Sequence, residues 1–212
     1  MLEPLPTALT DGDLVAAFPR RLSDEVRAVL AVMPGARLAP ASPFSVYVDD
    51  EALAIPCRIY PDEPPVDEVR TLTARQRVIL HCLYSRHHDG RVRQRHLKQV
   101  VGVDLPWVVP FVVQLVGEYV LEILEEIEDG LSGAGDAQSV RWALYGDFII
   151  RNPEFFALTE RRVASYWTCY HRWRFPVFGT YPGGRLLELL RAAASDRAGR
   201  RWPRHAPAGF KR

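Results

Sequence analysis

The stretch LPWVVPFVVQLVGEYVLEILEEIED, residues 105–129, decides the fold, because it holds the densest apolar material in the chain. Its apolar residues recur at three- and four-residue spacing, which is the period of an α-helix. The first half is apolar nearly all round, so we expect it to be buried on several sides. The protein core is therefore predicted to lie at residues 108–120.

Two residues predict how this helical material is interrupted. Pro110 lacks an amide hydrogen and clashes inside a helix, so the regular helix is expected to begin near Val109, with the proline in its first turn. Gly117 predicts a break between two shorter helices. Acidic residues then form a stripe that should face solvent. They are Glu118, Glu122, Glu125 and Asp129.

Size and composition are those of an ordinary globular protein. The chain has 212 residues and 48% hydrophobic content, enough for one domain with a small appendage. Its three cysteines are widely spaced, which predicts neither a disulfide framework nor a cysteine-rich zinc site. The uncharged run at residues 105–117 is well short of the roughly 20 residues that span a bilayer, so no membrane contact is predicted.

The N-terminus carries acids where a secretory leader would carry basic residues, which favours a cytoplasmic location. Charge is segregated along the chain. Residues 71–100 hold seven basic and one acidic side chain, and residues 101–130 hold seven acidic side chains and no basic one. Such blocks can steer partners or pair within the fold. Of 27 basic residues 25 are arginine, a bias typical of a GC-rich bacterial genome.

The order of patterns predicts a mainly α protein, a helical array of stacked helix pairs with a small N-terminal segment that contains a β-hairpin. Residues 1–68 are expected to form the N-terminal helices and the hairpin, whose strands meet at an acidic turn after Val48. The Pro-rich acidic segment 61–68 is the predicted domain boundary. Residues 69–195 are the helical domain, and residues 196–212 are a basic tail that is expected to be disordered.

In the helical domain, Thr73 and Gln76 have the spacing of a capping box and predict where a helix begins. The next helix turns Val92 and Leu97 inward. Its basic residues are expected on the outer surface. These are Arg91, Arg93, Arg95 and Lys98.

Further along the chain, the apolar residues 140–150 fit a helix or a strand, and the helical neighbours favour a helix. Thr159 is expected to cap a helix at residues 160–173. That helix carries a basic and aromatic cluster. Its rings either form core or stack on unpaired bases, while its guanidinium groups pair with acids or with phosphates. The cluster comprises Arg161, Arg162, Tyr166, Trp167, Tyr170, His171, Arg172, Trp173, Arg174 and Phe175.

Residues 72–130 resemble a HEAT-type helical repeat. DGRVRQRHL (89–97) is similar to the second-helix pattern of that family, and VVPFVVQLVGEYVLEI (108–123) is similar to a first helix with an early proline. The chain departs from the family pattern at Glu118 and Tyr119, where a turn aspartate and an arginine are absent. The resemblance implies stacked helix pairs that present a surface to a protein or a nucleic acid. A winged helix-turn-helix over the same residues is the alternative, although no clear wing follows.

No motif predicts catalysis. Four histidines lie within residues 81–96, but none has the close ligand spacing of a known metal motif, so no metal and no cofactor are predicted. Cys169 and His171 are two residues apart and would point to different faces of a helix. No nucleophile lies beside an orienting base, which makes an enzyme the third hypothesis.

The leading hypothesis is a non-catalytic adaptor or scaffold with a protein partner, and the alternative is a nucleic-acid-binding protein. The oligomeric state is left open. The candidate binding residues are Arg91, Arg93, Arg95, Lys98, Glu118, Glu122, Glu125, Arg161, Arg162, Trp167, Arg172, Trp173 and Arg174.

Overall fold

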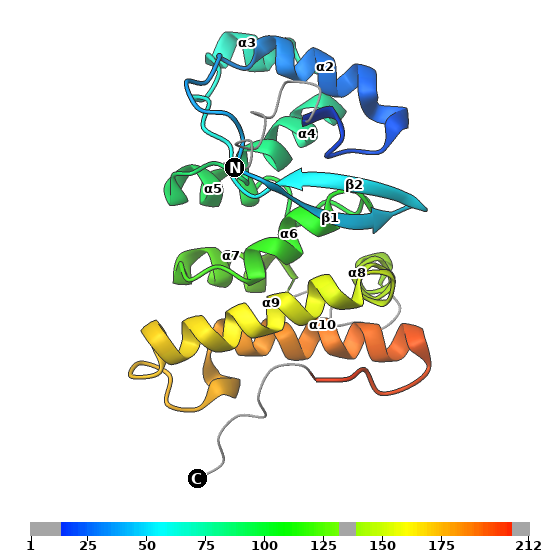
Figure 1. Cartoon of the computed structure of the whole chain (residues 1–212), viewed down its shortest axis with the longest axis vertical. Helices are drawn as coiled ribbons and strands as arrows, with labels where there is room; N and C mark the ends of the chain where they lie inside the picture. The colour runs from blue at the N-terminus through cyan, green and yellow to red at the C-terminus, as the bar shows by residue number, and fades with distance from the viewer. Residues whose placement is uncertain (1–13, 132–138, 205–212) are drawn as a thin grey trace, which may run out of the picture. The chain divides into compact units, whose positions relative to one another are not determined.

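The computed structural model describes residues 14–131 and 139–204 (Figure 1). Helices make up 60% of it, and the described residues contain nine α-helices and one two-stranded antiparallel sheet. The prediction of a mainly α protein with an N-terminal hairpin is confirmed. The chain divides into two compact units, Met1–His96 and Leu97–Arg212, and each is described by itself.

The first unit is built from short elements. They are η1 (Arg20–Leu22), α2 (Ser23–Val32), β1 (Pro43–Val48), β2 (Glu51–Pro56), α3 (Val66–Thr71), α4 (Ala74–Tyr84) and α5 (Gly90–Leu97), whose last residue opens the second unit. The second unit contains the longest helices of the described residues. They are α6 (Val109–Val116), α7 (Leu121–Leu131), α8 (Val140–Arg151), α9 (Pro153–Tyr166), the π-helical turn η3 (Trp167–His171), η4 (Phe178–Thr180) and α10 (Pro182–Ala198).

The hairpin closes on a two-residue acidic turn, as predicted. Val48 pairs with Glu51, and Asp49 and Asp50 between them have φ values of 49° and 63°. Aspartate tolerates this left-handed region better than most residues, and two successive positive φ values match the twist of a hairpin. An ion pair at 2.7 Å between Asp49 and Arg21 holds the turn beside the start of α2.

Residues on both sides of the Pro-rich segment belong to the first unit. Helix α4 packs on α2, and Ile59 forms a parallel bridge with His87. The last residues of the predicted linker are also helical, because α3 begins at Val66. The unit division therefore lies C-terminal to the segment 61–68, and separate folding of residues 1–68 stays a prediction. The predicted capping box at Thr73 and Gln76 is confirmed.

Helix α6 is the centre of the second unit, as predicted from its apolar sequence. Every residue from Val109 to Val116 is buried, and Pro110 lies in the first turn. The helix ends at Gly117, and α7 begins at Leu121, which confirms the predicted break. Helices α7, α8, α9 and α10 all contact α6. Burial of this apolar surface is the main stabilising contribution.

Helices α8 and α10 approach closely at Gly146. A Cβ atom at this position would lie 2.6 Å from the Ala193 carbonyl oxygen, so only glycine fits without movement of the backbone. One turn away, Arg197 donates from Nε and Nη2 to the two carboxylate oxygens of Asp147 at 2.8 and 2.9 Å.

The C-terminal helices differ from the prediction at two places. Helix α9 begins at Pro153, so Thr159 lies within it and its hydroxyl donates to the Phe155 carbonyl instead of capping a helix. The tail was predicted to begin at residue 196, but helical structure extends past that residue. Helix α10 continues to Ala198, Gly199 ends it with a φ of 62°, and Trp202 is buried. Residues 205–212 lie outside the described residues.

Candidate functional site

The first candidate site is a histidine cluster, Glu63, His81, Tyr84 and His96, formed by the linker and by helices α4 and α5. The two Nδ1 atoms of His81 and His96 are 2.9 Å apart, and His96 Nε2 is 2.8 Å from Glu63 Oε1. The Tyr84 ring stacks on the His96 ring with a centroid distance of 4.9 Å. Three groups distant in sequence thus form one continuous hydrogen-bonded chain.

The partners determine which nitrogen carries each proton. Burial raises the pKa of Glu63, but the hydrogen bonds from His96 and Arg95 outweigh it and lower the pKa, so this carboxylate is charged and can only accept. His96 must then donate from Nε2, which leaves its Nδ1 as an acceptor for the Nδ1 proton of His81. The acceptor nitrogen at the end of the chain is His81 Nε2.

Both rings resist protonation. Burial, the charge of His96 and the charge of Arg77 lower the pKa of His81 to about 4. Burial also lowers the pKa of His96, although its hydrogen bond to Glu63 acts in the opposite direction. The cluster is therefore neutral at its two rings near pH 7, and its polar groups are directed at one another.

The turn that joins α4 to α5 is held by two buried arginines. Arg86 is fully buried, and its Nε and Nη2 donate to the carbonyls of Pro56 and Cys57 at 3.3 and 2.8 Å. Arg93 is 3% exposed, and its Nη1 donates to the carbonyls of His87 and His88 at 2.9 Å each. The prediction that Arg93 faces outward is wrong, because this side chain satisfies the carbonyls of the turn.

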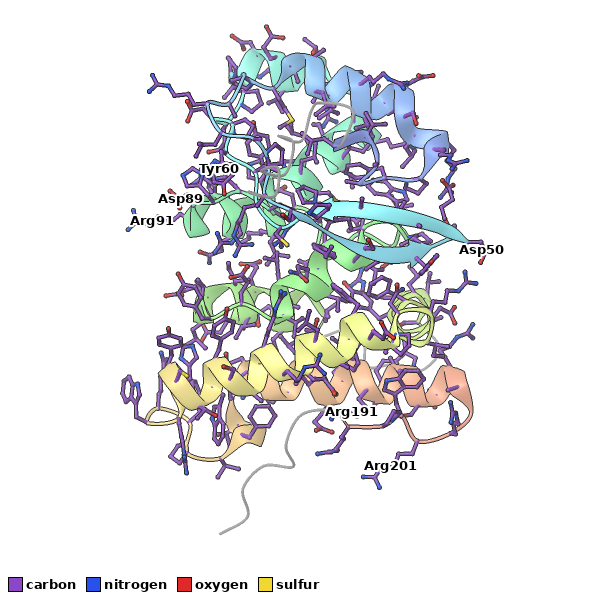
Figure 2. The ribbon with its side chains drawn as sticks, viewed as in Figure 1. Asp50, Tyr60, Asp89, Arg91, Arg191 and Arg201 are labelled. Carbon is purple, nitrogen blue, oxygen red and sulfur yellow. The ribbon has the colours of Figure 1, made fainter. Side chains whose placement is uncertain are left out.

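The other predicted basic residues of this region are exposed. Arg91 projects away from the first turn of α5, where Asp89 Oδ1 accepts from the Arg91 amide at 2.7 Å (Figure 2). Arg95 is paired with Glu63, and Lys98 lies 4.0 Å from Glu126. Only Arg91 of these three makes no ion pair within the described residues. Their role in binding stays a prediction.

The histidine cluster has no third metal ligand. Across residues 14–131 and 139–204, no three His, Cys, Asp or Glu side chains come together as a metal site. The carboxylate of Glu63 accepts from Nε2 of His96, on the side of the ring away from His81, and so orients the His96 ring.

The predicted acidic stripe of the second unit is only partly exposed. Glu118 is buried at 5% exposure, which corrects the expectation that it faces solvent. It lies in the turn between α6 and α7, where the chain packs toward α9. A Cβ atom added at the preceding Gly117 would lie 3.3 Å from the Arg162 side chain. Glu122 and Glu125, on α7, are exposed as predicted.

The basic and aromatic cluster divides into a buried part and an exposed part. Trp167 is 5% exposed, and its Nε1 donates to the Phe175 carbonyl at 2.8 Å. Trp173 is 82% exposed and Tyr170 is 57% exposed. Trp167 therefore belongs to the core, and Trp173 and Tyr170 lie on the surface. Neither interpretation, rings in the core or rings free to stack on bases, holds for all the rings of this cluster.

We call the exposed rings and arginines of this cluster, together with Tyr119, the aromatic–arginine surface. It comprises Tyr119, Tyr170, Trp173, Arg161, Arg172 and Arg174. Tyr119, in the turn before α7, is 50% exposed, and its ring centroid lies 5.9 Å from that of Tyr170. None of the three arginines makes an ion pair within the described residues, and Arg172 and Arg174 lie over the rings of Trp167 and Phe175. Arg162 is half-buried beside Gly117 and does not belong to this surface.

The π-helical turn η3 positions these rings. A π-turn widens the helix by one residue and is frequent at functional sites. Here it directs His171 toward Tyr119, whose carbonyl accepts from His171 Nε2 at 2.8 Å, and the His171 ring stacks on Tyr181 at 5.1 Å. The hydrogen bond connects the end of α9 to the turn before α7.

Sequence reasoning missed Tyr119 and Glu63 as site residues. Tyr119 continues the apolar period of the helix, and only the neighbouring Gly117 signals that the period is broken. Glu63 lies in a Pro-rich segment far from His96 in sequence, and no local pattern connects the two.

No family model matches this chain, and neither the curated proteins nor the solved structures contain a significant match. Among the described residues, no helix combines the length and the apolar character required to cross a bilayer.

Proposed function

We propose that this protein is a non-catalytic adaptor or scaffold that binds a protein partner through the aromatic–arginine surface. One observation carries the proposal. Three rings and three arginines are exposed in this unit, Tyr119 contacts Tyr170, Trp173 Nε1 donates to the Tyr170 carbonyl, and the arginines have no ion-pair partner within the described chain. Large exposed apolar side chains grouped in this way are characteristic of interaction sites.

The side chains favour a protein as the partner. Tyrosine, tryptophan and arginine are the residues that contribute most often to binding energy at protein interfaces. The three tyrosine rings of this region are tilted against one another. Tyr119, Tyr166 and Tyr170 meet at angles of 37° to 58°, so they do not present parallel open faces on which bases would stack.

The charge of the surface favours a partner with exposed carboxylates. Residues 161–187 contain five arginines and no acidic residue. Among the residues that the structure describes, only Arg185 of these makes an ion pair, with Glu128 at 2.5 Å. A surface of one sign attracts a partner of the opposite sign and raises the rate of association. The partner is therefore expected to place apolar side chains on the rings and carboxylates beside the arginines.

The same arginine-rich run supports the alternative, a nucleic acid. Phosphate contacts release counterions, so nucleic-acid binding weakens steeply with salt, whereas binding through ring contacts in a protein interface does not.

The resemblance of residues 72–130 to HEAT-type repeats remains part of the proposal. In the second unit, α6 and α7 pack on one another. We also propose that the protein acts in the cytoplasm, which agrees with its three unpaired cysteines.

Photo-crosslinking in cells of the source organism tests this proposal. A photoreactive phenylalanine analogue replaces Trp173, and the matched control carries it at Tyr47, which is 56% exposed on the hairpin of the first unit. We expect adducts at position 173 that resist nuclease and contain an acidic protein segment identified by mass spectrometry. Adducts that nuclease removes would establish the nucleic-acid alternative. Equal labelling at positions 173 and 47 would overturn the proposal.

A further inference from the structure

Three tyrosine rings of the second unit form one cluster. Tyr119, Tyr166 and Tyr170 lie against one another, with ring centroids 5.8, 5.9 and 6.1 Å apart. Tyr166 at the end of α9 is half-buried, whereas Tyr170 in η3 and Tyr119 are exposed. The hydrogen bond from His171 to the Tyr119 carbonyl ties the turn before α7 to η3. The cluster therefore joins two segments that are distant in sequence and is open to a partner at two of its rings.

The inclination of these rings decides which side chains fit against them. The ring planes meet at 37° to 58°, so no two of them offer a common flat face. A planar group needs such a face to stack on. Proline side chains are compact saturated rings that pack in the angle between inclined aromatic faces, and Pro-rich segments bind aromatic-lined grooves in this way. The shape of the cluster therefore favours proline over a flat ligand.

The hydroxyls of the three tyrosines are donors without an internal acceptor. Within residues 14–131 and 139–204, none of them makes a hydrogen bond. A helical partner satisfies its own backbone carbonyls, whereas a polyproline II segment has no internal hydrogen bonds and presents its carbonyls to its surroundings. The described part of the second unit contains no β-strand, so a partner strand has no sheet edge to extend there. The free phenol donors therefore favour an extended Pro-rich segment over a helix or a strand.

The charges beside the cluster determine what accompanies the prolines. Trp173 Nε1 donates to the Tyr170 carbonyl at 3.0 Å, which fixes this exposed indole beside Tyr170. Arg172 and Arg174 are its neighbours in the chain, and both are exposed and make no ion pair within the described residues. These guanidinium groups attract carboxylates and repel the cationic ligands that aromatic clusters otherwise bind.

We propose that the aromatic–arginine surface, together with Tyr166, binds a Pro-rich segment of its partner in the polyproline II conformation, with acidic residues beside the prolines. The proline rings pack on the tyrosine cluster, and the phenol hydroxyls donate to backbone carbonyls of the segment. The carboxylates pair with Arg172 and Arg174. This inference rests on the proposed function of the surface and specifies the chemistry of its occupant.

Isothermal titration calorimetry of the full chain with three synthetic peptides tests the proposal. The first peptide has six prolines between two pairs of glutamates, the second has alanines in place of the prolines, and the third has lysines in place of the glutamates. We expect the first peptide to bind and the other two to bind at least tenfold more weakly. Equal affinity of the alanine peptide would overturn the Pro-rich occupant, and equal affinity of the lysine peptide would overturn its acidic flanks.

Removal of hydroxyls tests the tyrosine contacts without removing the rings. Tyr119→Phe combined with Tyr170→Phe should weaken binding of the proline peptide several-fold, because two donors are lost. The matched control Tyr47→Phe, on the hairpin of the first unit, should leave binding unchanged. An unchanged affinity in the double variant contradicts the donor role of the hydroxyls. If the proline peptide does not bind at all, the Pro-rich occupant is wrong, and the proposed function still stands when the probe at position 173 captures another acidic protein segment.

Discussion

Residues 86–98 and residues 161–174 are both rich in arginine and in ring-bearing side chains, yet the structure directs their polar groups differently. In the first stretch Arg86 and Arg93 are buried, and their guanidinium groups bind backbone carbonyls of the hairpin end and the turn. In the second stretch Arg172 and Arg174 are exposed and lie over the rings of Trp167 and Phe175. Composition alone does not separate a cluster that stabilises the fold from one that is available to a partner.

The difference follows from what surrounds each stretch. The turn after α4 leaves carbonyls of His87 and His88 that no helix satisfies, and an unpaired buried carbonyl is costly. An arginine three or more residues along the next helix can reach them. At the end of α9, Trp167 Nε1 donates to the Phe175 carbonyl, and the His171 carbonyl accepts from the amides of Arg174 and Phe175. No guanidinium bond to a carbonyl is recorded for Arg172 or Arg174 within the described residues.

The strongest test of the comparison is on adjacent residues of α9, Glu160 and Arg161. Glu160 is fully buried and accepts from Arg191 of α10, which Figure 2 labels. We expect Glu160→Ala to lower the free energy of unfolding by about 3 kcal/mol, because the buried Arg191 guanidinium then keeps only its ion pair with the more exposed Glu188. Arg161→Ala, measured alongside by urea denaturation, should change it by less than about 0.5 kcal/mol. Similar losses for both variants would contradict the assignment of Arg161 to a free surface.

The next largest effect is expected in the first unit. Arg93→Ala removes the donor to two turn carbonyls and should cost about 2–3 kcal/mol of stability. Its neighbour on the same helix, Arg91, is the matched control, and Arg91→Ala should be nearly neutral. Chemical denaturation of both variants checks the prediction. A neutral Arg93→Ala would return this residue to the set of candidate binding residues.

The histidine cluster predicts a pH dependence of smaller size. The pKa of His81 is about 4 in the folded chain against 6.5 for an ordinary histidine, so the unfolded chain binds more protons between these values. Stability is therefore greatest above pH 6.5 and falls as the pH drops toward 4. We expect a loss of about 1–2 kcal/mol from this partly exposed ring, reduced by solvent screening.

Measurement of the unfolding free energy between about pH 7.5 and about pH 5.5 checks this prediction, because most carboxylates stay charged throughout that range. His81→Asn keeps a polar group near His96 Nδ1 and removes the titrating ring, so it should flatten the curve. An unchanged pH dependence in His81→Asn would show that the ring titrates normally in the folded chain.

The smallest effect on stability is expected at the exposed rings. The double variant Tyr170→Ala and Trp173→Ala should change the free energy of unfolding by less than about 0.5 kcal/mol, because Trp173 is 82% exposed. The same variant should weaken partner binding at least tenfold. Photo-crosslinking with the phenylalanine analogue in place of Arg174 would measure this loss. Loss of stability without loss of binding would reverse the roles that we assign to the two stretches.

Much of the fold could be predicted from local sequence. Four features are patterns within a few residues. They are the apolar period of α6, its start at Val109 with Pro110 in the first turn, the break at Gly117 and the capping box at Thr73. Each depends on local geometry, and each was predictable for that reason.

The remainder depends on contacts between residues distant in sequence. Glu118 was expected in solvent because its helical neighbours are acidic, but the chain turns at Gly117 and buries it. Trp167 and Trp173 lie in the same cluster, and only the π-turn and the Phe175 carbonyl determine that one is buried and the other exposed. The pairing of Glu63 with His96 crosses a hairpin-to-helix linker and leaves no local pattern.

Hydroxyl-radical footprinting in cells of the source organism tests most directly whether a partner covers the aromatic–arginine surface. The oxidation rates of Trp173 and Tyr170 are compared between intact cells and the dilute purified chain, with the similarly exposed Tyr47 as the internal reference. We predict that Trp173 and Tyr170 react several-fold more slowly in cells while Tyr47 is unchanged. Equal rates for all three residues in both conditions would contradict the account, because the exposed rings would then have no partner.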